Sequence, residues 1–198
     1  MFEYLMPSLW MRSHPNTLLE RSQAGAVKSQ QAYAHELGVP WGISESAYGE
    51  MNETHHYKYH AFGLPDLALH KPEFDALVIS PYSTFLALNI DPLASLENLR
   101  RMVDLGWWGA YGFFEAADYT TVQRRVFRRR PTKVRCWMAH HQGMTLLALA
   151  NFLRDNVVQR WFHKEGRVQA TELLLHEKPV AHVRRTDLPR RRRHTLAA

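Results

Sequence analysis

Residues 80–105, SPYSTFLALNIDPLASLENLRRMVDL, decide the fold class that the sequence predicts. Ser80-Pro81 and Asp91-Pro92 each place a proline at a first helical position directly after a residue that caps helices. We therefore expect one helix through residues 81–90 and a second through residues 92–105. Because almost no loop separates the two helices, we expect them to pair as an antiparallel hairpin.

Helical patterns extend to both sides of this hairpin. Asn16 or Thr17 can cap a helix through LLERSQAGAVKSQQAYAHEL, which ends at Gly38 because Pro40 forbids continuation. Three further helices are expected after the hairpin: a mostly buried one at 134–154 and two final ones at 155–166 and 167–178.

Strand signals are weak by comparison. The segment YKYHAF, residues 57–62, is the one candidate for a short strand, and no alternating run is long enough to predict a sheet. Six helix candidates joined by aromatic-rich loops predict an all-α fold built from helical hairpins.

Composition limits the class of protein. The chain has 198 residues, of which 45% are hydrophobic and 12% aromatic, so it contains enough apolar surface for one folded domain. A lone cysteine, Cys136, excludes an internal disulfide framework and a cysteine-cage zinc site, and it fits a reducing compartment. The most apolar stretch, 144–153, is far shorter than the ~20 residues of a membrane span. We expect no membrane span and no signal peptide in this chain.

The net charge of +6 comes from two local runs of basic residues. Residues 124–135 hold seven basic side chains and residues 184–193 hold six, whereas the rest of the chain has 12 basic and 18 acidic side chains. This distribution argues against a globally basic nucleic-acid scaffold. We interpret the first run as a solvated loop and residues 181–198 as a disordered basic tail whose attraction to polyanions is nonspecific.

The first candidate catalytic residue is Glu45 in the segment WGISESAY, residues 41–48. Trp41 and Tyr48 flank it, and a carboxylate between aromatic rings is typical of sugar sites, where rings stack on the pyranose and burial favours a general acid. The alternative is that Glu45 caps a short helix while Trp41 and Tyr48 are ordinary core residues.

A second carboxylate lies in GWWGAYGFFEAADYT, residues 106–120. Glu115 follows a cluster of aromatic residues that includes Trp108 and Tyr111, and paired carboxylates are the usual equipment for glycoside cleavage. Asp118 stands three residues later, which on a helical turn would place it on the same face as Glu115. The alternative is that both acids stabilise a helix N-terminus.

Histidines form two further candidate groups. His140 and His141 are adjacent, so a metal site that uses both is disfavoured on a helix, and one of them is expected to face a pocket and bind sugar hydroxyls. A satisfied core histidine is the alternative. His55, His56 and His60 lack the carboxylate or cysteine that would complete a familiar ligand spacing, so we expect no metal and no cofactor.

The motifs together resemble the glycoamylase-like domain of bacterial cyclic β-1,2-glucan synthases and related carbohydrate-active proteins. The matching segments, in order, are MFEYLMP, GVPWGISESAY, FGLPDLAL, SPYST, GWWGAYGFFEAADYT, MAHHQGM and RVQATELLL, which together span roughly residues 1–178. The basic residues after 180 do not resemble the family. The resemblance therefore gives a domain at 1–180 followed by the tail at 181–198.

The resemblance implies an (α/α)₆ toroid whose inner helix ends and loops form a sugar-binding cleft. Six helix candidates are about half of such a toroid, so the chain is expected to be a fragment of a larger synthase. In those synthases a membrane-associated glycosyltransferase domain lies before this domain and a phosphorylase-like domain after it. A cytoplasmic location at the inner membrane is the corresponding expectation.

The resemblance also implies site residues. Glu45 is expected as general acid/base and Glu115 as nucleophile in retaining hydrolysis or transglycosylation of β-1,2-glucan, with Glu3 and Asp118 as reserve carboxylates. Retention requires carboxyl groups ~5–5.5 Å apart, whereas ~6.5–9.5 Å indicates inversion. The expected sugar contacts are Trp41, Tyr48, Tyr59, Trp108, Tyr111, Asp118 and His140. A non-catalytic carbohydrate-binding fragment is the main alternative, and specific nucleic-acid binding the least favoured one.

Overall fold

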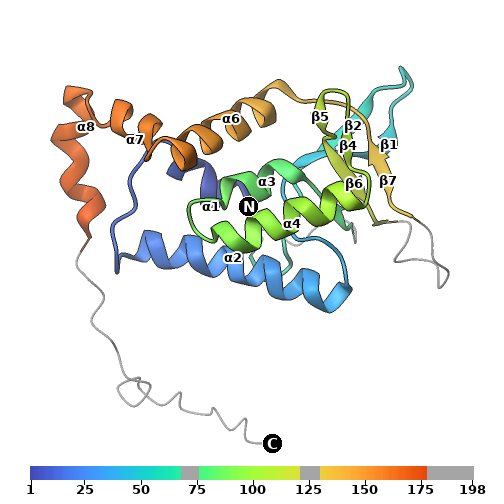
Figure 1. Cartoon of the computed structure of the whole chain (residues 1–198), viewed down its shortest axis with the longest axis horizontal. Coiled ribbons are helices and arrows are strands. Elements are labelled where there is room, and N and C mark those ends of the chain that lie inside the picture. The colour runs from blue at the N-terminus through green and yellow to red at the C-terminus, as the bar shows by residue number, and fades with distance from the viewer. Residues whose placement is uncertain (68–75, 121–129, 178–198) are drawn as a thin grey trace, which may run out of the picture.

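The structure is a computed structural model that describes residues 1–67, 76–120 and 130–177 (Figure 1). Its helices are α1 (Phe2–Leu5), η1 (Met6–Leu9), α2 (Leu18–Leu37), α3 (Pro81–Leu86), α4 (Pro92–Asp104), α6 (Ala139–Leu153), α7 (Val157–Phe162), α8 (Gly166–Thr171) and η2 (Glu172–His176). Its strands are β1 (Ser46–Met51), β2 (Tyr57–His60), β3 (Val78–Ile79), β4 (Trp108–Gly109), β5 (Gly112–Phe113), β6 (Ala116–Asp118) and β7 (Thr132–Val134).

Helix α2 begins and ends where the sequence predicts. The Thr17 side chain accepts a hydrogen bond from the backbone N–H of Glu20, which satisfies a donor of the first turn. Gly38 ends the helix in the left-handed conformation, at φ 67°, where glycine has no steric penalty. The predicted helix at 18–37 is confirmed.

The predicted hairpin of α3 and α4 is also present. Asp91 caps α4 by accepting from the backbone N–H of Ala94, and Pro92 occupies its first position. In Figure 1 the chain reverses between the two helices, which contact one another. Helix α3 ends at Leu86 instead of continuing to residue 90, because residues 87–90 form turns that lead directly to the Asp91 cap.

The expectation of an all-α fold needs correction, because about half of the described residues are helical and small sheets accompany the helices. Antiparallel β3, β6 and β7 form one sheet in that order, and β1–β2 and β4–β5 form two-stranded sheets. The candidate strand at 57–62 is confirmed as β2. Strands of two to six residues are too short to show a recognisable alternation, which is why the others were missed.

The helix expected at 134–154 is shorter and less buried than predicted. Residues 132–134 form β7, and α6 begins only at Ala139. One face of α6 is buried, through His141, Met144, Ala148 and Asn151. Leu146 and Leu153 on this helix are exposed, so the prediction of a mostly buried helix is wrong.

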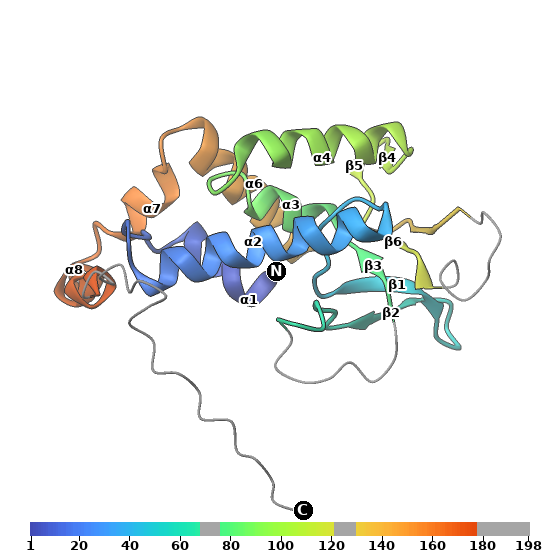
Figure 2. The same ribbon diagram turned by 90° about the horizontal axis from the view of Figure 1, so that it is seen from below.

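The long helices lie side by side, and the strands gather near one end of them (Figures 1 and 2). One hydrophobic cluster packs α1, η1, α2, α3 and α6 together around side chains such as Leu5, Val27 and Leu86. A second cluster joins the strands to α4 through residues such as Ile79, Met102 and Trp107. The loop that contributes Trp41 to the first cluster and Ile43 to the second also carries Glu45 of the candidate site.

Three further expectations concern membranes and charge. None of the helices in the described residues is both long and apolar enough to cross a bilayer. Most of the first basic run and all of the 181–198 tail lie outside the described residues, so the loop and tail interpretations stay predictions.

Candidate active site

The loop that carries Glu45 is held by two buried amide side chains. Gln30 of α2 donates to the carbonyl oxygen of Ile43 at 2.8 Å and accepts from its N–H at 2.9 Å. Asn98 of α4 makes the same pair of contacts with the backbone of Trp41, at 2.8 Å and 3.1 Å. Because four backbone groups of a buried loop are satisfied in this way, residues 41–43 are fixed between α2 and α4.

Close packing against α3 fixes the loop further. Gly42 has φ +126°, and its carbonyl oxygen accepts from the N–H of Ser80 at 2.9 Å. A Cβ atom at Gly42 would lie 2.6 Å from Ser83 Oγ, so only glycine fits. Next to it, the Ser44 hydroxyl pairs with the Tyr82 hydroxyl at 2.8 Å, and the Tyr82 hydroxyl also donates to the Glu45 carbonyl oxygen at 3.0 Å.

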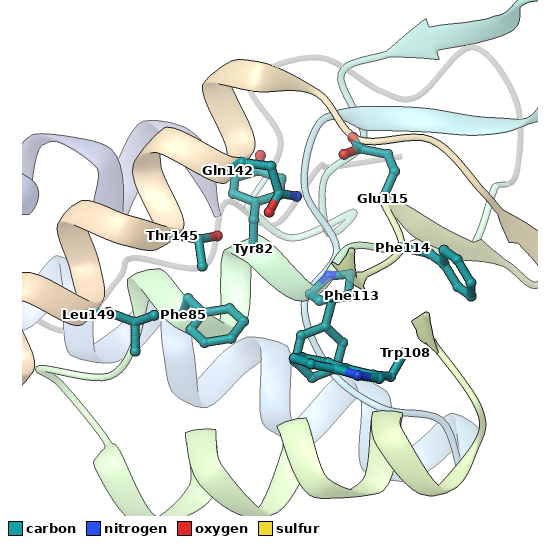
Figure 3. A pocket seen from close by; sticks show the side chains of 11 residues that line it. Tyr82, Phe85, Trp108, Phe113, Phe114, Glu115, Gln142, Thr145 and Leu149 are labelled. Carbon is teal, nitrogen blue, oxygen red and sulfur yellow. The ribbon is translucent and has the colours of Figure 1, made fainter. Parts of the chain in front are cut away.

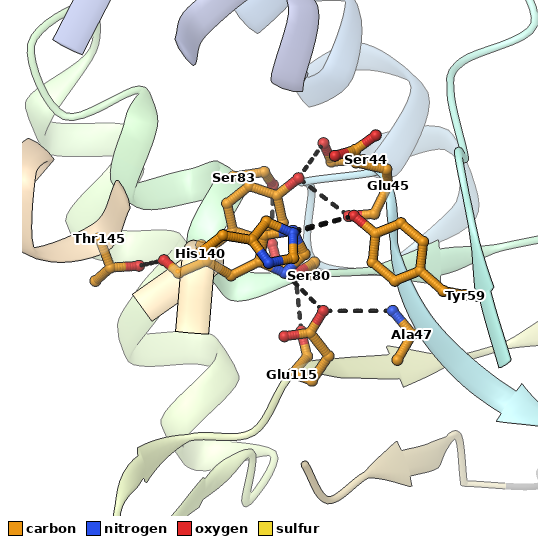
Figure 4. Close-up of polar contacts among 11 residues, drawn as sticks. Ser44, Glu45, Ala47, Tyr59, Ser80, Ser83, Glu115, His140 and Thr145 are labelled. Atoms are coloured by element: carbon orange, nitrogen blue, oxygen red, sulfur yellow. Dashed lines mark hydrogen bonds and ion pairs between the residues drawn. The ribbon is translucent and has the colours of Figure 1, made fainter. Parts of the chain in front are cut away.

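Two carboxylates, two histidines and a tyrosine converge at this point (Figure 4). We call them the carboxylate–histidine cluster: Glu45, Tyr59, Glu115, His140 and His141. Glu45 comes from the loop before β1, Tyr59 from β2, Glu115 from the residue before β6, and both histidines from the first turn of α6. Segments far apart in the sequence thus supply one site.

Glu115 and His141 form the buried centre of the cluster. His141 Nδ1 lies 2.7 Å from Glu115 Oε1, and the two side chains are 0% and 1% exposed. The same oxygen accepts from the backbone N–H of Ala47 at 3.3 Å. The Tyr82 ring stacks on the His141 ring at 3.8 Å between centroids. These contacts give Glu115 Oε1 two hydrogen-bond partners and leave His141 with one orientation.

Hydrogen bonding defines the tautomer of a neutral His141. Since Glu115 accepts at Nδ1, that nitrogen carries the proton and Nε2 is free to accept. The Tyr59 hydroxyl lies 3.3 Å from His141 Nε2 and 3.4 Å from His140 Nε2. The Tyr59 hydroxyl is therefore within hydrogen-bond reach of the acceptor nitrogen of the His141 ring.

The surroundings keep Tyr59 protonated and His140 neutral. Burial, a hydrogen bond with Glu45 and the charges of Glu45 and Glu115 raise the pKa of Tyr59 well above its ordinary value. Burial and the neighbouring His141 lower the pKa of His140, against the opposing attraction of Glu115 and Glu45. At neutral pH the cluster thus presents an intact phenol and uncharged His140 beside two carboxyl groups.

The sequence disfavoured a metal site that uses both adjacent histidines. His141 is buried and His140 is exposed beside the Tyr59 ring, yet the centroids of the two imidazole rings are only 4.0 Å apart. One ligand atom from each of them and one from Glu45 lie within 4.8 Å of one another. A cation there would compete with the Tyr59 hydroxyl for both Nε2 atoms and with the hydrogen bond that Tyr59 makes to Glu45.

A pocket opens beside Glu115 (Figure 3). It has a volume of about 160 Å³ and lies between α3, the β4–β5 hairpin and α6. Five of its eleven lining residues are aromatic, and Glu115 and Gln142 supply polar groups. Its lining includes Tyr82, Phe85, Trp108, Phe113, Phe114, Glu115, Gln142, Thr145 and Leu149. Apolar walls with a few convergent polar groups are the usual form of a small-molecule site.

The remaining predicted contacts lie in two settings. Trp41 and Tyr48 are buried in the two hydrophobic clusters, as the alternative that both are ordinary core residues predicts. Trp108 is exposed at the pocket wall, and Tyr111 is exposed with its ring edge-on to that of Trp137. Glu3 is exposed on α1.

Asp118 has a structural environment. Its Oδ2 accepts from the N–H of Gly49 at 2.9 Å and its Oδ1 from the N–H of Thr120 at 2.8 Å. It lies on strand β6, so the expectation that Asp118 and Glu115 share a helical turn is wrong. The alternative in which these acids begin a helix is wrong for the same reason.

Sequence reasoning missed two members of the site. It selected His140 as the sugar contact, whereas His141 is the residue that contacts Glu115, and it gave Tyr82 no role. The adjacent pair was the available signal for His141, but the helix boundary that decides which histidine faces inward lies at Ala139, five residues later than expected. Nothing local marks Tyr82 as more than a residue of a buried helix.

With this geometry established, the class of protein follows from a family comparison: the chain belongs to the Glycoamylase family, described as "Putative glucoamylase", whose model matches residues 1–166. Its carbohydrate-active relatives include a cyclic β-(1,2)-glucan synthase, NdvB, of Rhizobium meliloti, which is 39% identical over 178 residues. That match covers 90% of this chain and 6% of the synthase, so the chain spans a small part of that relative.

Solved structures show the same fold. An endo-β-1,2-glucanase from Chitinophaga pinensis, in complex with sophorotriose and glucose, matches with a TM-score of 0.60 and 18% identity. A "putative glucoamylase" from Bacteroides caccae matches with a TM-score of 0.60 and 19% identity. Each match covers 88% of this chain and 40% of the solved chain.

Proposed function

We propose that this chain is the part of a glycoamylase-like domain that carries the catalytic carboxylates for cleavage or transfer of β-1,2-glucan. The observation that supports it most is that Glu45 and Glu115 converge on the same pair of histidines: Glu115 contacts His141 at 2.7 Å, and ligand atoms of Glu45, His140 and His141 lie within 4.8 Å of one another. Figure 4 shows Glu45, Glu115 and His140 at this point. The relatives named above, a β-1,2-glucan synthase and an endo-β-1,2-glucanase, support the substrate class.

The two carboxyl groups have environments suited to different roles. Glu115 is buried, and its hydrogen bonds with His141 and the Ala47 N–H hold its carboxyl group in one position, which suits a nucleophile. Glu45 is half-buried and shares a hydrogen bond with Tyr59, whose phenol stays protonated. Glu45 is therefore the better candidate for exchange of a proton with the leaving group and with water.

In the proposed retaining reaction, a Glu115 oxygen attacks the anomeric carbon and forms a glycosyl ester as the glycosidic C–O bond breaks. Glu45 gives its proton to the departing sugar oxygen. The Glu45 carboxylate then takes a proton from water, or from a sugar hydroxyl, as that oxygen attacks the anomeric carbon and the bond from this carbon to Glu115 breaks, which releases the Glu115 carboxylate. Water gives hydrolysis, and a sugar hydroxyl gives transglycosylation.

We also propose that the chain forms about half of an (α/α)₆ toroid. Coverage of 40% of each solved chain supports this, as do the apolar side chains that the helices leave exposed. Leu93, Leu96 and Val103 on α4 and Leu146 and Leu153 on α6 belong to this set. A second set of helices would cover such faces in a complete toroid.

The test is incubation of the chain with linear β-1,2-glucan and, as a matched substrate, linear β-1,3-glucan, with products followed by chromatography. The proposal predicts new reducing ends or altered chain lengths only from the β-1,2-linked polymer. Equal turnover of both polymers would contradict the proposed substrate class.

The exposed helix faces favour a second candidate function, a non-catalytic carbohydrate-binding unit whose cleft needs the rest of the toroid. This function predicts that β-1,2-glucan binds the chain, as seen by calorimetry, without any turnover. The same titration with Trp108→Ala then tests whether the pocket wall makes the contact.

A further inference from the structure

A second group of histidines comes from the C-terminal helices and the segment before α2. These segments lie at the end of the helices away from the strands (Figure 1). One ligand atom each from His14, Glu172 and His176 lie within 4.8 Å of one another. The His14 and His176 rings stack at 3.8 Å between centroids. Two imidazoles and a carboxylate are thus concentrated at one point without a role in the proposed reaction.

Two buried ring nitrogens at this point have no hydrogen-bond partner among the described residues: His14 Nε2 and His163 Nδ1. The His163 side chain is 1% exposed, and its Nδ1 lies 3.3 Å from Glu172 Oε1, in a geometry that makes no hydrogen bond. Buried polar atoms are normally satisfied, so this pair of exceptions calls for an explanation. A bound cation would supply the missing partner of His14.

The residues around Glu172 are arranged to orient it. The backbone N–H of Arg12 donates to His163 Nε2 at 3.2 Å, so a neutral His163 carries its proton on Nδ1, the nitrogen that faces Glu172. Arg12 Nη1 also donates to Glu172 Oε1, at 3.3 Å. Both contacts use Oε1, which leaves Oε2 for another partner. Outer groups that hold a ligating carboxylate in this way are typical of metal sites.

We propose that His14, Glu172 and His176 bind a zinc-class divalent cation, with Arg12 as a positioning residue for Glu172. Two imidazoles and one carboxylate form a known zinc ligand set, which water completes to four ligands. Imidazole donors favour such ions over magnesium or calcium.

The rearrangement that binding requires is small. Tetrahedral coordination at ~2.1 Å places ligand atoms about 3.4 Å apart, so the three groups must close in from their separation of up to 4.8 Å. The His176 side chain is exposed and can rotate away from its stacked position on the His14 ring. The Arg12 side chain, 42% exposed, can move toward solvent as the cation takes over the charge of Glu172.

The cation would join two distant parts of the chain. Beyond the three ligands, the C-terminal helices reach this region through Glu177, which accepts from the N–H groups of Leu18 and Leu19 at the start of α2. Leu173 and Leu174 of η2 are exposed, so polar contacts carry much of this docking. A metal bridge from His14 to Glu172 and His176 would fix α8 and η2 against α2.

The experiment is calorimetric titration of the metal-free full chain with Zn²⁺, followed by Co²⁺ substitution for visible absorption. We expect one Zn²⁺ per chain and a Co²⁺ spectrum of the intense four-coordinate type. His176→Gln, a change at an exposed side chain, should weaken Zn²⁺ binding at least ~10-fold, because loss of a residue that only hydrogen-bonds to a metal ligand already has an effect of that size. His140→Gln is the matched control in the other cluster and should leave binding unchanged.

Limited trypsin digestion supplies a readout that does not depend on a variant. Zn²⁺ should slow cleavage after Arg167, because the bridge holds α8 in place, and Mg²⁺ should not. Absence of a stoichiometric Zn²⁺ site in the parent chain would overturn the proposal. Wild-type affinity in His176→Gln, or loss of the site in His140→Gln, would also overturn it.

Discussion

His141 Nδ1 lies 2.7 Å from Glu115 Oε1, and both side chains are almost completely buried. Removal of one member of such a pair leaves the other polar group without its partner, which costs about 3–5 kcal/mol when the stranded group is charged. His141→Gln should therefore lower the free energy of unfolding by several kcal/mol in urea denaturation. His140→Gln, at the exposed neighbour, should change it by about 0.5 kcal/mol or less.

A double-mutant cycle separates the interaction energy of this contact from the other destabilising effects of the two substitutions. Glu115→Gln combined with His141→Gln should cost less than the sum of the single changes, because the contact is lost only once. Strict additivity would mean that the two side chains stabilise the fold independently.

Gly42 offers a test of the loop that carries Glu45. Gly42→Ala should destabilise the chain by about 2 kcal/mol or more, since φ +126° and the nearby Ser83 hydroxyl exclude a methyl group. Gly25→Ala is the matched control in the middle of α2, where a Cβ meets nothing within 4 Å. It should stabilise the helix by about 0.5–1 kcal/mol. Thermal unfolding of the two variants measures both effects, and equal shifts would contradict the described loop conformation.

Alkaline pH should destabilise the fold through Tyr82. Burial and the charges of Glu45, Tyr59 and Glu115 raise its pKa above the ordinary value near 10, although the Ser44 hydrogen bond opposes them. Above pH 10 the unfolded chain loses a proton that folded Tyr82 keeps, so stability falls as pH rises, by up to about 1.4 kcal/mol per pH unit.

Denaturation at pH 9 and 10.5 measures this loss, and Tyr82→Phe should make it smaller. If the variant lost the same amount of stability as the parent chain, another group would be responsible.

The pocket wall predicts a change in sugar affinity. Trp108 is exposed at the pocket beside Glu115, and Trp161 is similarly exposed on α7. Trp108→Ala should weaken binding of β-1,2-gluco-oligosaccharides by about 5–10-fold, since an aromatic stacking contact contributes about 1 kcal/mol. Trp161→Ala should leave the dissociation constant unchanged in the same calorimetric titration. If Trp161→Ala weakened sugar binding and Trp108→Ala did not, the sugar site would lie outside this pocket.

Much of the helical framework could be predicted because its signals are local. Thr17 and Gly38 mark both ends of α2, and Asp91-Pro92 marks the start of α4. The segments that carry Glu45 and Glu115 were also predicted, because carboxylates inside aromatic clusters are conspicuous in the sequence.

What the sequence could not show depends on contacts between distant segments. Strand β6 is defined by its pairing with β3 and β7, so residues 116–118 could be taken for a helical turn. That strand places Glu115 next to α6, and the start of α6 decides that His141 faces inward. The tertiary structure therefore decides which of the two adjacent histidines faces inward.

The most direct test of Glu45 and Glu115 as the catalytic pair compares three matched changes on one substrate. Turnover of linear β-1,2-glucan should fall by at least ~10³-fold in both Glu45→Gln and Glu115→Gln, as expected when a carboxyl group of a glycosidase pair is removed. Glu50→Gln, at the exposed ion pair with Lys58, should keep the parent rate. Parent-like turnover in either Glu45→Gln or Glu115→Gln, with folding confirmed by circular dichroism, would contradict the account.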